Sequence, residues 1–393
     1  MSRKVDVLVL GGGVTGCATA YFLASRPDFS GSVMVVERDP TYENAPSAKA
    51  TGGFRQQFST PENIWMGLYG AEFVKNIDSY LSVDGEPVGL LFREQGYMLL
   101  ATADAMPIMR QAHAVQVEHG ADIVFKSLED LAAEFPWVGR EEIEGAFIGQ
   151  SDEGWVDPYM LLQAFRKKAS SLGVEFVKDE ALRINTANGR ATGATLEGLG
   201  EVEAGFLVNA AGARGARALA HTVDVALPLE SRLRCTFVFE CREDFSRAPL
   251  TILPNGCAWR PEGSRYLTNF APPPERDPET FEFDIDYSWF EEEIWPALAR
   301  WIPAFEAIKL SSAYACHYDF NTLDENLIID RLGNLDNAFF AAGFSGHGLQ
   351  QSPAVGRALS ELICDGEFKS IDLTRFGFAR VLAGDGLREL NCW

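Results

Sequence analysis

The sequence predicts an α/β protein in which a Rossmann-like domain with a parallel sheet is combined with a second domain built on a mixed sheet. Three observations favour this class. The chain opens with a strand, a Gly-rich turn, a helix and a second strand. Apolar strands that end in small residues return near positions 206 and 340. Short β-type runs mixed with helices separate these parts of the chain.

The first element is a buried strand at residues 5–10, which read VDVLVL. The turn GGGVTG follows it, and the apolar residues after this turn recur at helical spacing. Residues 33–37 (VMVVE) are expected to form the second apolar strand. Strand, helix and strand within about 35 residues make a βαβ unit, whose crossover should be right-handed.

The Gly-rich turn carries the fingerprint Gly11-x-Gly13-x-x-Gly16 between a strand and a helix, which is the context this motif requires. Gly11 permits the tight turn, Gly13 lets the backbone approach a pyrophosphate, and Gly16 lets helix and strand pack closely. Glu37 ends the second strand, where a carboxylate accepts hydrogen bonds from ribose hydroxyls and repels a 2′-phosphate. The pattern therefore indicates a dinucleotide other than NADP, but it does not separate NAD from FAD.

Further elements follow from caps, breakers and periodicity along the chain. Asp157 is expected to cap a helix that has Pro158 in its first turn, where proline is tolerated. A helix is also expected after residues 343–348, with Pro353 in its first turn. The other predicted elements are strands at 96–102, 205–212, 327–330 and 338–343 and helices at 104–120, 128–136 and 289–301.

The pieces that resemble nucleotide-binding elements are discontinuous in the sequence. We assign residues 1–80, 150–220 and 325–393 to that domain, and residues 81–149 and 221–324 to a second domain that covers the bound ligand. No internal repeat or low-complexity segment interrupts this division.

Composition and charge exclude several classes of partner. The chain of 393 residues has a formal net charge of −22, which argues against nucleic acid or an anionic membrane as its main partner. No apolar run approaches the roughly 18–20 residues that a membrane span needs. Asp6 and the glycines after it speak against a signal peptide at the start of the sequence. The oligomeric state is not indicated.

The cysteines indicate the redox compartment. They are scattered and form no CxxC pair; their positions are Cys17, Cys235, Cys241, Cys257, Cys316, Cys364 and Cys392. An odd, scattered set fits a reducing compartment, and it fits neither a disulfide scaffold nor a zinc site. We therefore expect a cytoplasmic protein without a bound metal.

Three later segments decide between the two dinucleotides. They are SAKATGGFRQQFSTPEN at 47–63, FLVNAAGARG at 206–215 and AAGFSGHGLQQSPAVGRALSELI at 341–363. In this order they resemble the D-amino-acid oxidase/sarcosine oxidase (DAO) family of FAD-dependent oxidoreductases. The resemblance covers nearly the whole chain, and it implies FAD as the cofactor and a glutathione-reductase-type FAD fold.

The resemblance and the fingerprint together imply a set of FAD contacts. In the family, the first segment runs beside the flavin ring, the second passes near the pyrophosphate, and the third contacts the flavin. The implied FAD-binding residues are Gly11, Gly13, Val14, Thr15, Gly16, Glu37, Arg38, Thr51, Gly52, Gly53, Phe54, Leu182, Ala210, Ala211, Gly212, Gly343, Phe344, Ser345, Gly346, His347, Gly348, Leu349 and Gln350.

The helix after residues 343–348 is suited to flavin chemistry. Reduction of FAD places negative charge near the N1/C2 carbonyl edge of the ring. The free N–H groups at a helix start stabilise such charge, and the glycines before the helix allow a close approach of the backbone. We therefore expect this helix start to face the pyrimidine edge of the flavin.

The candidate residues around a substrate are Arg55, Tyr266, His317, Tyr318, His347 and Gln350. Arg55 either lies over the flavin ring or clamps a substrate carboxylate with its bidentate fork. Pairing of Arg55 with one of the many surface acids is an equal alternative. Each of the others could instead be a packing group at a domain interface.

The chain departs from sarcosine oxidases at several of these positions. Gln350 stands where those enzymes carry a Lys that binds the substrate carboxylate. Arg265 and Tyr266 lie in the stretch that compares with their Lys near flavin N5, which activates dioxygen. His317 occupies the place of a cysteine that some of them bond covalently to the flavin, with Cys316 adjacent, and we expect noncovalent FAD. The departures favour a quinone or an electron-transfer protein as an alternative acceptor to dioxygen.

The resemblance implies oxidation of the C–N bond of a small amine or amino acid, with a secondary or N-methyl amino acid favoured. A hydride would move from the C–H beside the nitrogen to flavin N5, and water would hydrolyse the imine. Two alternatives stay open, because a fold supports a specific function only weakly. One is a 2-hydroxy-acid dehydrogenase on the same scaffold, and the other is a flavoprotein with mainly an assembly or binding role.

Overall fold

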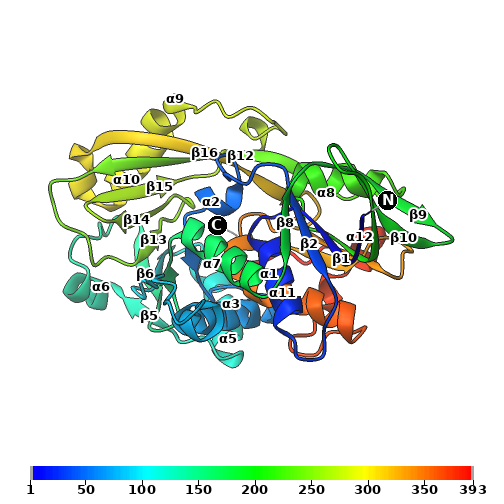
Figure 1. Cartoon of the computed structure of the whole chain (residues 1–393). Helices are drawn as coiled ribbons and strands as arrows, with labels where there is room; N and C mark the ends of the chain where they lie inside the picture. Colours follow the sequence, from blue (N-terminus) through cyan, green and yellow to red (C-terminus); the bar gives the residue numbers. More distant parts are fainter. Residues whose placement is uncertain (1–2, 391–393) are drawn as a thin grey trace.

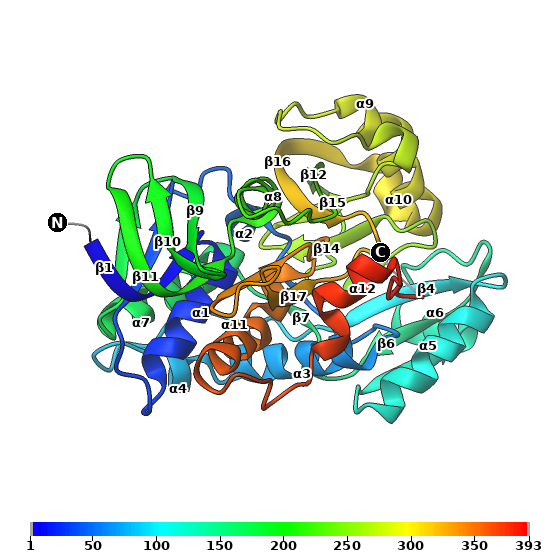
Figure 2. The ribbon, with the colours of Figure 1, turned by 90° about the vertical axis from the view of Figure 1, so that its right-hand side faces the viewer.

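Two eight-stranded sheets dominate the computed structural model, which describes residues 3–390. Figures 1 and 2 show the two sheets at opposite ends of the molecule, with α2 (Pro46–Lys49) and α3 (Pro61–Lys75) between them. The predicted α/β class is therefore confirmed.

The first sheet is the parallel, Rossmann-like one. Its parallel core has the order β18-β11-β1-β2-β8, to which β17 adds an antiparallel edge, while β9 and β10 extend from β11 as an antiparallel hairpin. The strands are β1 (Arg3–Leu10), β2 (Val33–Glu37), β8 (Glu175–Lys178), β9 (Ala181–Ala187), β10 (Arg190–Leu196), β11 (Gly200–Asn209), β17 (Ile328–Arg331) and β18 (Ala338–Ala342).

Both faces of this sheet are covered, as its continuous apolar strands require. Val7 and Val9 of β1 face a layer made by α1 (Val14–Ser25), α7 (Pro158–Ser171) and α11 (Gly348–Cys364), which Figure 1 shows side by side. Leu8 and Leu10 face the opposite side, toward the β9–β10 hairpin and α8 (Gly212–His221). The alternation of β1 thus builds two cores from one strand.

The second sheet is mixed, because β13 and β4 pair in parallel and the other neighbours are antiparallel. Its order is β16-β12-β15-β14-β13-β4-β6-β5. The strands are β4 (Tyr97–Thr102), β5 (Ile123–Ser127), β6 (Ile143–Gly149), β12 (Leu229–Glu240), β13 (Leu250–Ile252), β14 (Ala258–Glu262), β15 (Arg265–Asn269) and β16 (Lys309–Asn321). A short pair, β3 (Gly53–Phe54) and β7 (Gly154–Trp155), lies outside both sheets.

One face of the second sheet packs against α6 (Leu128–Glu134), α9 (Tyr287–Trp289) and α10 (Trp295–Trp301). The remaining helices are α4 (Ile77–Leu81), α5 (Met106–Glu118) and α12 (Phe378–Ala383), with short turns η1 (Pro274–Arg276), η2 (Phe290–Ile294), η3 (Pro303–Ala307) and η4 (Thr374–Phe376). All strands of the first sheet come from the segments assigned to the nucleotide-binding domain, and all strands of the second from the other two. This distribution supports the proposed division into domains.

The predicted cap of α7 is confirmed, since the Asp157 carboxylate accepts a hydrogen bond from Met160 N at 2.8 Å. The prediction for Pro353 is wrong: α11 already begins at Gly348, so the proline lies inside the helix. Pro353 cannot donate to the Leu349 carbonyl. The Ser352 hydroxyl donates to that carbonyl instead, at 2.8 Å, so the helix continues past the proline.

The described cysteines are free thiols, and Cys392 lies outside the described residues. Between residues 3 and 390, no helix is long and apolar enough to cross a membrane. Within the same range, no cluster of three or more His, Cys, Asp or Glu side chains is arranged to hold a metal ion.

Candidate functional site

Loops that follow the strands of the first sheet meet at one edge of it. Because β1, β2, β11 and β18 are parallel neighbours, their carboxyl ends lie at the same edge. The turn at Gly11, the carboxylate of Glu37 and the loops that begin at Ala210 and Gly343 therefore come together, although they are far apart in the sequence. They border a single cavity of about 990 Å³, which extends to the second sheet.

Most of the sequence-predicted FAD residues line this cavity. They are Gly11, Gly13, Val14, Thr15, Glu37, Arg38, Thr51, Gly52, Gly53, Leu182, Ala210, Ala211, Gly212, Phe344, Ser345, Gly346, His347, Gly348, Leu349 and Gln350. Their convergence supports the proposed FAD contacts.

Three predicted FAD residues do not line the cavity, because they lie in the packing behind its surface. They are Gly16, Phe54 and Gly343. A Cβ on Gly16 would lie 1.9 Å from the Gly11 carbonyl oxygen, so this glycine lets α1 approach the turn. The Phe54 ring is buried against Phe92. Gly343 N donates to the Asp319 carboxylate at 3.0 Å, which fixes the start of the loop before α11.

The wall of the cavity fits a dinucleotide. Gly11 has a φ of +101°, and a Cβ there would lie 2.4 Å from the Ala210 carbonyl oxygen, so only glycine allows this turn. The N-cap residues of α1 and α11, Gly13 and His347, make no side-chain cap, and both helix starts border the cavity. At α1 the Ser47 hydroxyl accepts from Val14 N at 3.1 Å. The other N–H groups of a helix start attract phosphate at one end and a charged ring edge at the other.

Glu37 borders the cavity at the end of β2. Its Oε2 accepts from Gly12 N at 2.8 Å and its Oε1 from Asp39 N at 2.9 Å, so the carboxylate is held in place by backbone. Each carboxylate oxygen keeps a further lone pair for a hydroxyl group. This geometry supports the ribose contact that the sequence predicts.

Arg55 is a buried cation on the cavity wall. Its side chain is almost fully buried, and none of the ion pairs within residues 3–390 includes it. The guanidinium lies 4.7 Å from the centre of the Phe58 ring, and its Nη1 atom is buried without a hydrogen-bond partner. Pairing with a surface acid is therefore not what the structure shows, and the arginine is available to a bound anion or to the flavin.

His347 orients Arg55. The N-terminal cap position of α11 is His347, and its Nε2 lies 3.3 Å from Arg55 Nη2. A guanidinium can only donate, so the imidazole Nε2 accepts, and the proton of the neutral ring is on Nδ1. Burial lowers the pKa of His347 to about 3, and the positive charge of Arg55 adds to this effect. His347 therefore supports the arginine as a neutral acceptor.

Gln350 and His317 line the cavity, but both are engaged by backbone groups. The Gln350 Oε1 accepts from Arg55 N at 2.8 Å, so this side chain holds the arginine segment. His317 Nε2 lies 2.8 Å from the Glu282 carbonyl oxygen and therefore carries the proton. Burial lowers the pKa of His317 below its usual value. Noncovalent FAD beside His317 and Cys316 stays a prediction.

Tyr266 does not reach the cavity, so its prediction as a substrate residue is wrong. Successive residues of a strand point to opposite faces of a sheet, and Tyr266 points to the packed face of the second sheet. Its hydroxyl donates to the Glu243 carbonyl and accepts from Phe245 N. Arg265, on the same strand, is half-exposed and pairs with Glu240.

Sequence reasoning missed the arginine that this hairpin does present to the cavity. Arg260 of β14 lies opposite Leu267 of β15, on the cavity-facing side, and is almost fully buried. Its Nε donates to the Thr51 carbonyl at 2.8 Å, which connects the second sheet to the flavin-contacting segment. The alternation of β14 says which of its residues share a face. Which of the two faces borders the cavity follows only from the register of the sheet.

Two tyrosines also line the cavity, and one of them was missed. Tyr97 of β4 places its hydroxyl so close to Gly53 that a Cβ on this glycine would lie 1.7 Å from the oxygen. Tyr318 of β16 was predicted, and its ring packs beside Gly346. Neither hydroxyl has a hydrogen-bond partner among the residues that the structure describes. Both are free to bond a ligand.

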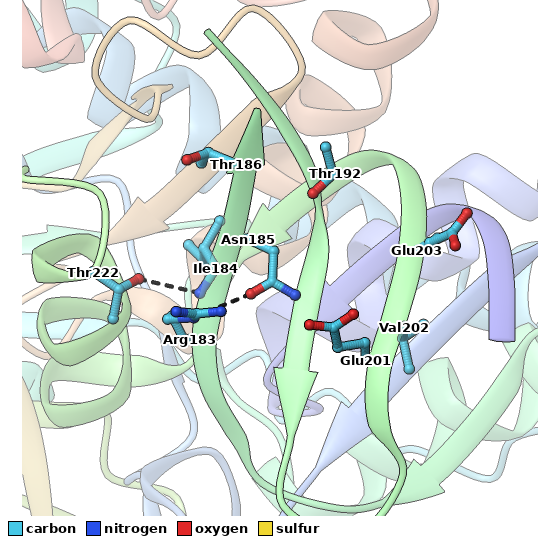
Figure 3. A pocket seen from close by; sticks show the side chains of 9 residues that line it. All are labelled: Arg183, Ile184, Asn185, Thr186, Thr192, Glu201, Val202, Glu203 and Thr222. Atoms are coloured by element: carbon cyan, nitrogen blue, oxygen red, sulfur yellow. Dashed lines mark hydrogen bonds between the residues drawn. The ribbon is translucent and has the colours of Figure 1, made fainter. Parts of the chain in front are cut away.

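A second, smaller depression lies on the β9–β10–β11 surface, as Figure 3 shows. It is lined by polar side chains such as Asn185, Thr192 and Glu201. The Asn185 side chain accepts from Arg183 Nε at 3.2 Å, so part of its polar lining is satisfied internally. None of the sequence-predicted site residues borders it, and the candidate site is the large cavity.

The fold and the cavity define a flavin-dependent oxidoreductase. The chain belongs to the family described as FAD dependent oxidoreductase (DAO), whose model matches residues 6–362. The predicted family and the predicted FAD cofactor are thereby confirmed.

Among curated proteins, the chain is 38% identical to FAD-dependent oxidoreductase domain-containing protein 1 of Bos taurus, over 98% of this chain and 87% of that protein. It is 23% identical to monomeric sarcosine oxidase of Bacillus sp. (strain B-0618), over 99% of both chains. Among solved structures, L-proline dehydrogenase from P. horikoshii superposes with a TM-score of 0.87 at 22% identity, over 98% of this chain and 100% of that chain. Glycine oxidase from Geobacillus kaustophilus gives a TM-score of 0.81 at 20% identity, over 96% and 98%. The structural likenesses show the fold alone.

Proposed function

We propose that this FAD-dependent oxidoreductase oxidises the C–N bond of a small amine or amino acid, with a secondary or N-methyl amino acid favoured. The observation that carries the proposal is the buried Arg55 without a carboxylate partner, in the cavity that the predicted FAD contacts line. A buried guanidinium without an ion-pair partner is stabilised by a bound anion. The two oxygens of an amino-acid carboxylate match its two parallel N–H donors. Relatives named sarcosine oxidase and glycine oxidase agree with this substrate class.

FAD, when bound, supplies the acceptor for the hydride. The residues of this chain bind and orient the substrate: Arg55 holds its carboxylate, and the hydroxyls of Tyr97 and Tyr318 offer hydrogen bonds to its nitrogen. The amine must be bound with a free lone pair, so it must lose a proton before the reaction. Exclusion of water by the covering second sheet strengthens each of these contacts.

Oxidation of a 2-hydroxy acid is less well supported by the cavity. An alcohol needs a base that removes its proton during the reaction. His347 already accepts from Arg55, and with a pKa of about 3 it is a poor base at neutral pH. An amine that binds in its neutral form does not need such a base.

Anaerobic titration of the flavin tests the proposal. We expect N-methyl amino acids to bleach the flavin absorbance, while lactate and 2-hydroxyglutarate leave it unchanged. Bleaching by hydroxy acids alone, or by neither class, would contradict the proposal. Admission of air afterwards distinguishes dioxygen from a quinone or an electron-transfer protein as the acceptor, because only an oxidase recovers its colour rapidly. A cytoplasmic location remains part of this proposal, and cell fractionation tests it.

A further inference from the structure

Two buried arginines approach the same part of the cavity from different elements. Arg55 follows β3, and Arg260 comes from β14 of the second sheet. Arg260 donates to the Thr51 carbonyl, four residues before Arg55, and the Tyr97 hydroxyl lies against Gly53 between them. Burial raises the pKa of Tyr97, while both arginines lower it, so the two positive charges act on one phenol.

Neither arginine has a buried ion-pair partner in the described part of the chain. The Arg55 guanidinium lies beside the neutral His347 and the Phe58 ring, and it acts on Glu153 only through its charge, which lowers the pKa of that carboxyl. Arg260 pairs with Glu262, but half of that side chain is exposed, and solvent screens the pair. Arg234, another arginine on the cavity wall, is different: Asp277 accepts two hydrogen bonds from it, of 2.7 and 2.8 Å, so its charge is compensated inside the protein.

The buried carboxylates nearby do not replace the missing anions. Glu153 accepts from Gln56 N, Gln57 Nε2 and Tyr97 N, and burial raises its pKa to about 7. Asp319 accepts from the backbone N–H groups that begin the loop before α11, and burial raises its pKa to about 6. Neither forms an ion pair with an arginine in the described part of the chain. Both are already satisfied by N–H donors.

FAD would not neutralise the pair either. Its negative charges are on the pyrophosphate, which the Gly11–Gly16 turn would hold, and an oxidised flavin ring is neutral. Two buried guanidinium groups therefore lack a buried anion, and a substrate with two negative groups would supply one to each, because burial of a poorly compensated charge is costly. This local concentration of positive charge contrasts with the formal net charge of −22 of the whole chain.

We propose that the substrate is an amino dicarboxylic acid, substituted on its nitrogen, with one carboxylate at Arg55 and the other at Arg260. This inference rests on the proposed function and names the substrate class of the same site. It predicts that a ligand with two carboxylates binds far more tightly than a ligand of equal chain length with one.

Binding of non-oxidisable acids to the FAD-loaded protein tests the inference without any turnover. The probes are succinate against butyrate and glutarate against pentanoate, with dissociation constants from isothermal calorimetry and from changes in flavin absorbance. We expect each dicarboxylate to bind about 10–100-fold more tightly than its monocarboxylate, the value of one added charge-assisted contact. Arg260→Gln should remove this advantage and leave monocarboxylate binding unchanged. Gln can still donate to the Thr51 carbonyl, which protects the fold.

The matched control is Arg265→Gln, a half-exposed arginine of the same hairpin that does not border the cavity. This variant should retain the full preference for dicarboxylates. Equal binding of mono- and dicarboxylates by the wild type would overturn the inference, as would an equal loss of both in Arg260→Gln. A loss of FAD from Arg260→Gln would assign the arginine to the cofactor and also overturn it. If dicarboxylates bind as expected but no N-methyl amino diacid reduces the flavin, the site for two carboxylates stands, while the proposed C–N oxidation and the amino diacid as its substrate fail.

Discussion

At the scale of single residues, the site depends on buried polar groups that form hydrogen bonds with one another. His347, Gln350 and Glu153 all act on the segment around Arg55: the first accepts from its guanidinium, the second from its amide, and the third from the amide of the next residue. The arginine is therefore positioned before any ligand binds. Such preorganisation reduces the cost of ordering the site when a substrate arrives.

Glu153 gives this arrangement a measurable dependence on pH. Burial raises its pKa in the folded protein to about 7, from an ordinary value of 4.5. Between these values the folded state binds a proton that the unfolded state has released, so stability falls as pH rises. From pH 5 to pH 8 this group should cost roughly 2–3 kcal/mol of unfolding free energy.

Urea denaturation of wild type and Glu153→Gln at both pH values measures this cost. We expect the variant to gain roughly 2–3 kcal/mol relative to wild type between pH 5 and pH 8, because its amide does not titrate. Glu144→Gln, at an exposed carboxylate on β6, should show no such change. A constant difference between wild type and Glu153→Gln would show that Glu153 keeps an ordinary pKa.

At the scale of elements, α3 depends on the far end of the chain. Its N-cap residue, Thr60, makes no side-chain cap. The Glu389 carboxylate takes this role by accepting from Ser59 N, Thr60 N and the Asn63 side chain. A carboxylate at a helix N-terminus also interacts favourably with the helix dipole.

Loss of this external cap should destabilise the protein. We expect Glu389→Gln to lower the free energy of unfolding by about 1–2 kcal/mol, the usual value of a helix cap. Glu367→Gln, at an exposed carboxylate, is the control and should change it by less than about 0.5 kcal/mol. Chemical denaturation at pH 7.5 measures both, and equal stability of the two variants would mean that the tail contributes no cap.

Much of the fold could be predicted from the sequence, because local signals decided it. The βαβ unit, the Asp157 cap and the glycine fingerprint are all encoded within short windows. The long strands β12 and β16 were expected only as short runs, since the charged and polar residues on their cavity face, such as Arg234, break the apolar pattern. Helix α3 was missed, although Thr60-Pro61-Glu62 carries an N-terminal signal.

The candidate site shows the same difference between residues that local sequence signals place and residues that they do not. Residues in turns after parallel strands could be placed, because such turns meet at one sheet edge. Residues on the second sheet were placed only in part: His317 and Tyr318 do line the cavity. Tyr266 was chosen where Arg260 and Tyr97 face the cavity, since the facing side follows from a register that no local pattern specifies.

At the scale of the whole molecule, the cavity joins the two sheets, so FAD should stabilise the protein as a unit. Binding to the folded state alone adds about 2.7 kcal/mol when free FAD exceeds its Kd a hundredfold. We expect the Tm to rise with FAD concentration in a single transition. FMN at the same concentration should raise it less, because it lacks the adenosine half that Glu37 would hold. Equal effects of FMN and FAD would contradict the predicted ribose contact.

The first sheet takes β1 from the start of the chain and β18 from near its end, and Glu389 reaches back to Ser59. During translation, the opening βαβ unit therefore emerges long before its neighbours on the sheet exist. A nascent chain cannot close this sheet until β18 has left the ribosome. The apolar strands made earlier wait unpaired until then, the stage at which chaperones protect unfinished domains from aggregation.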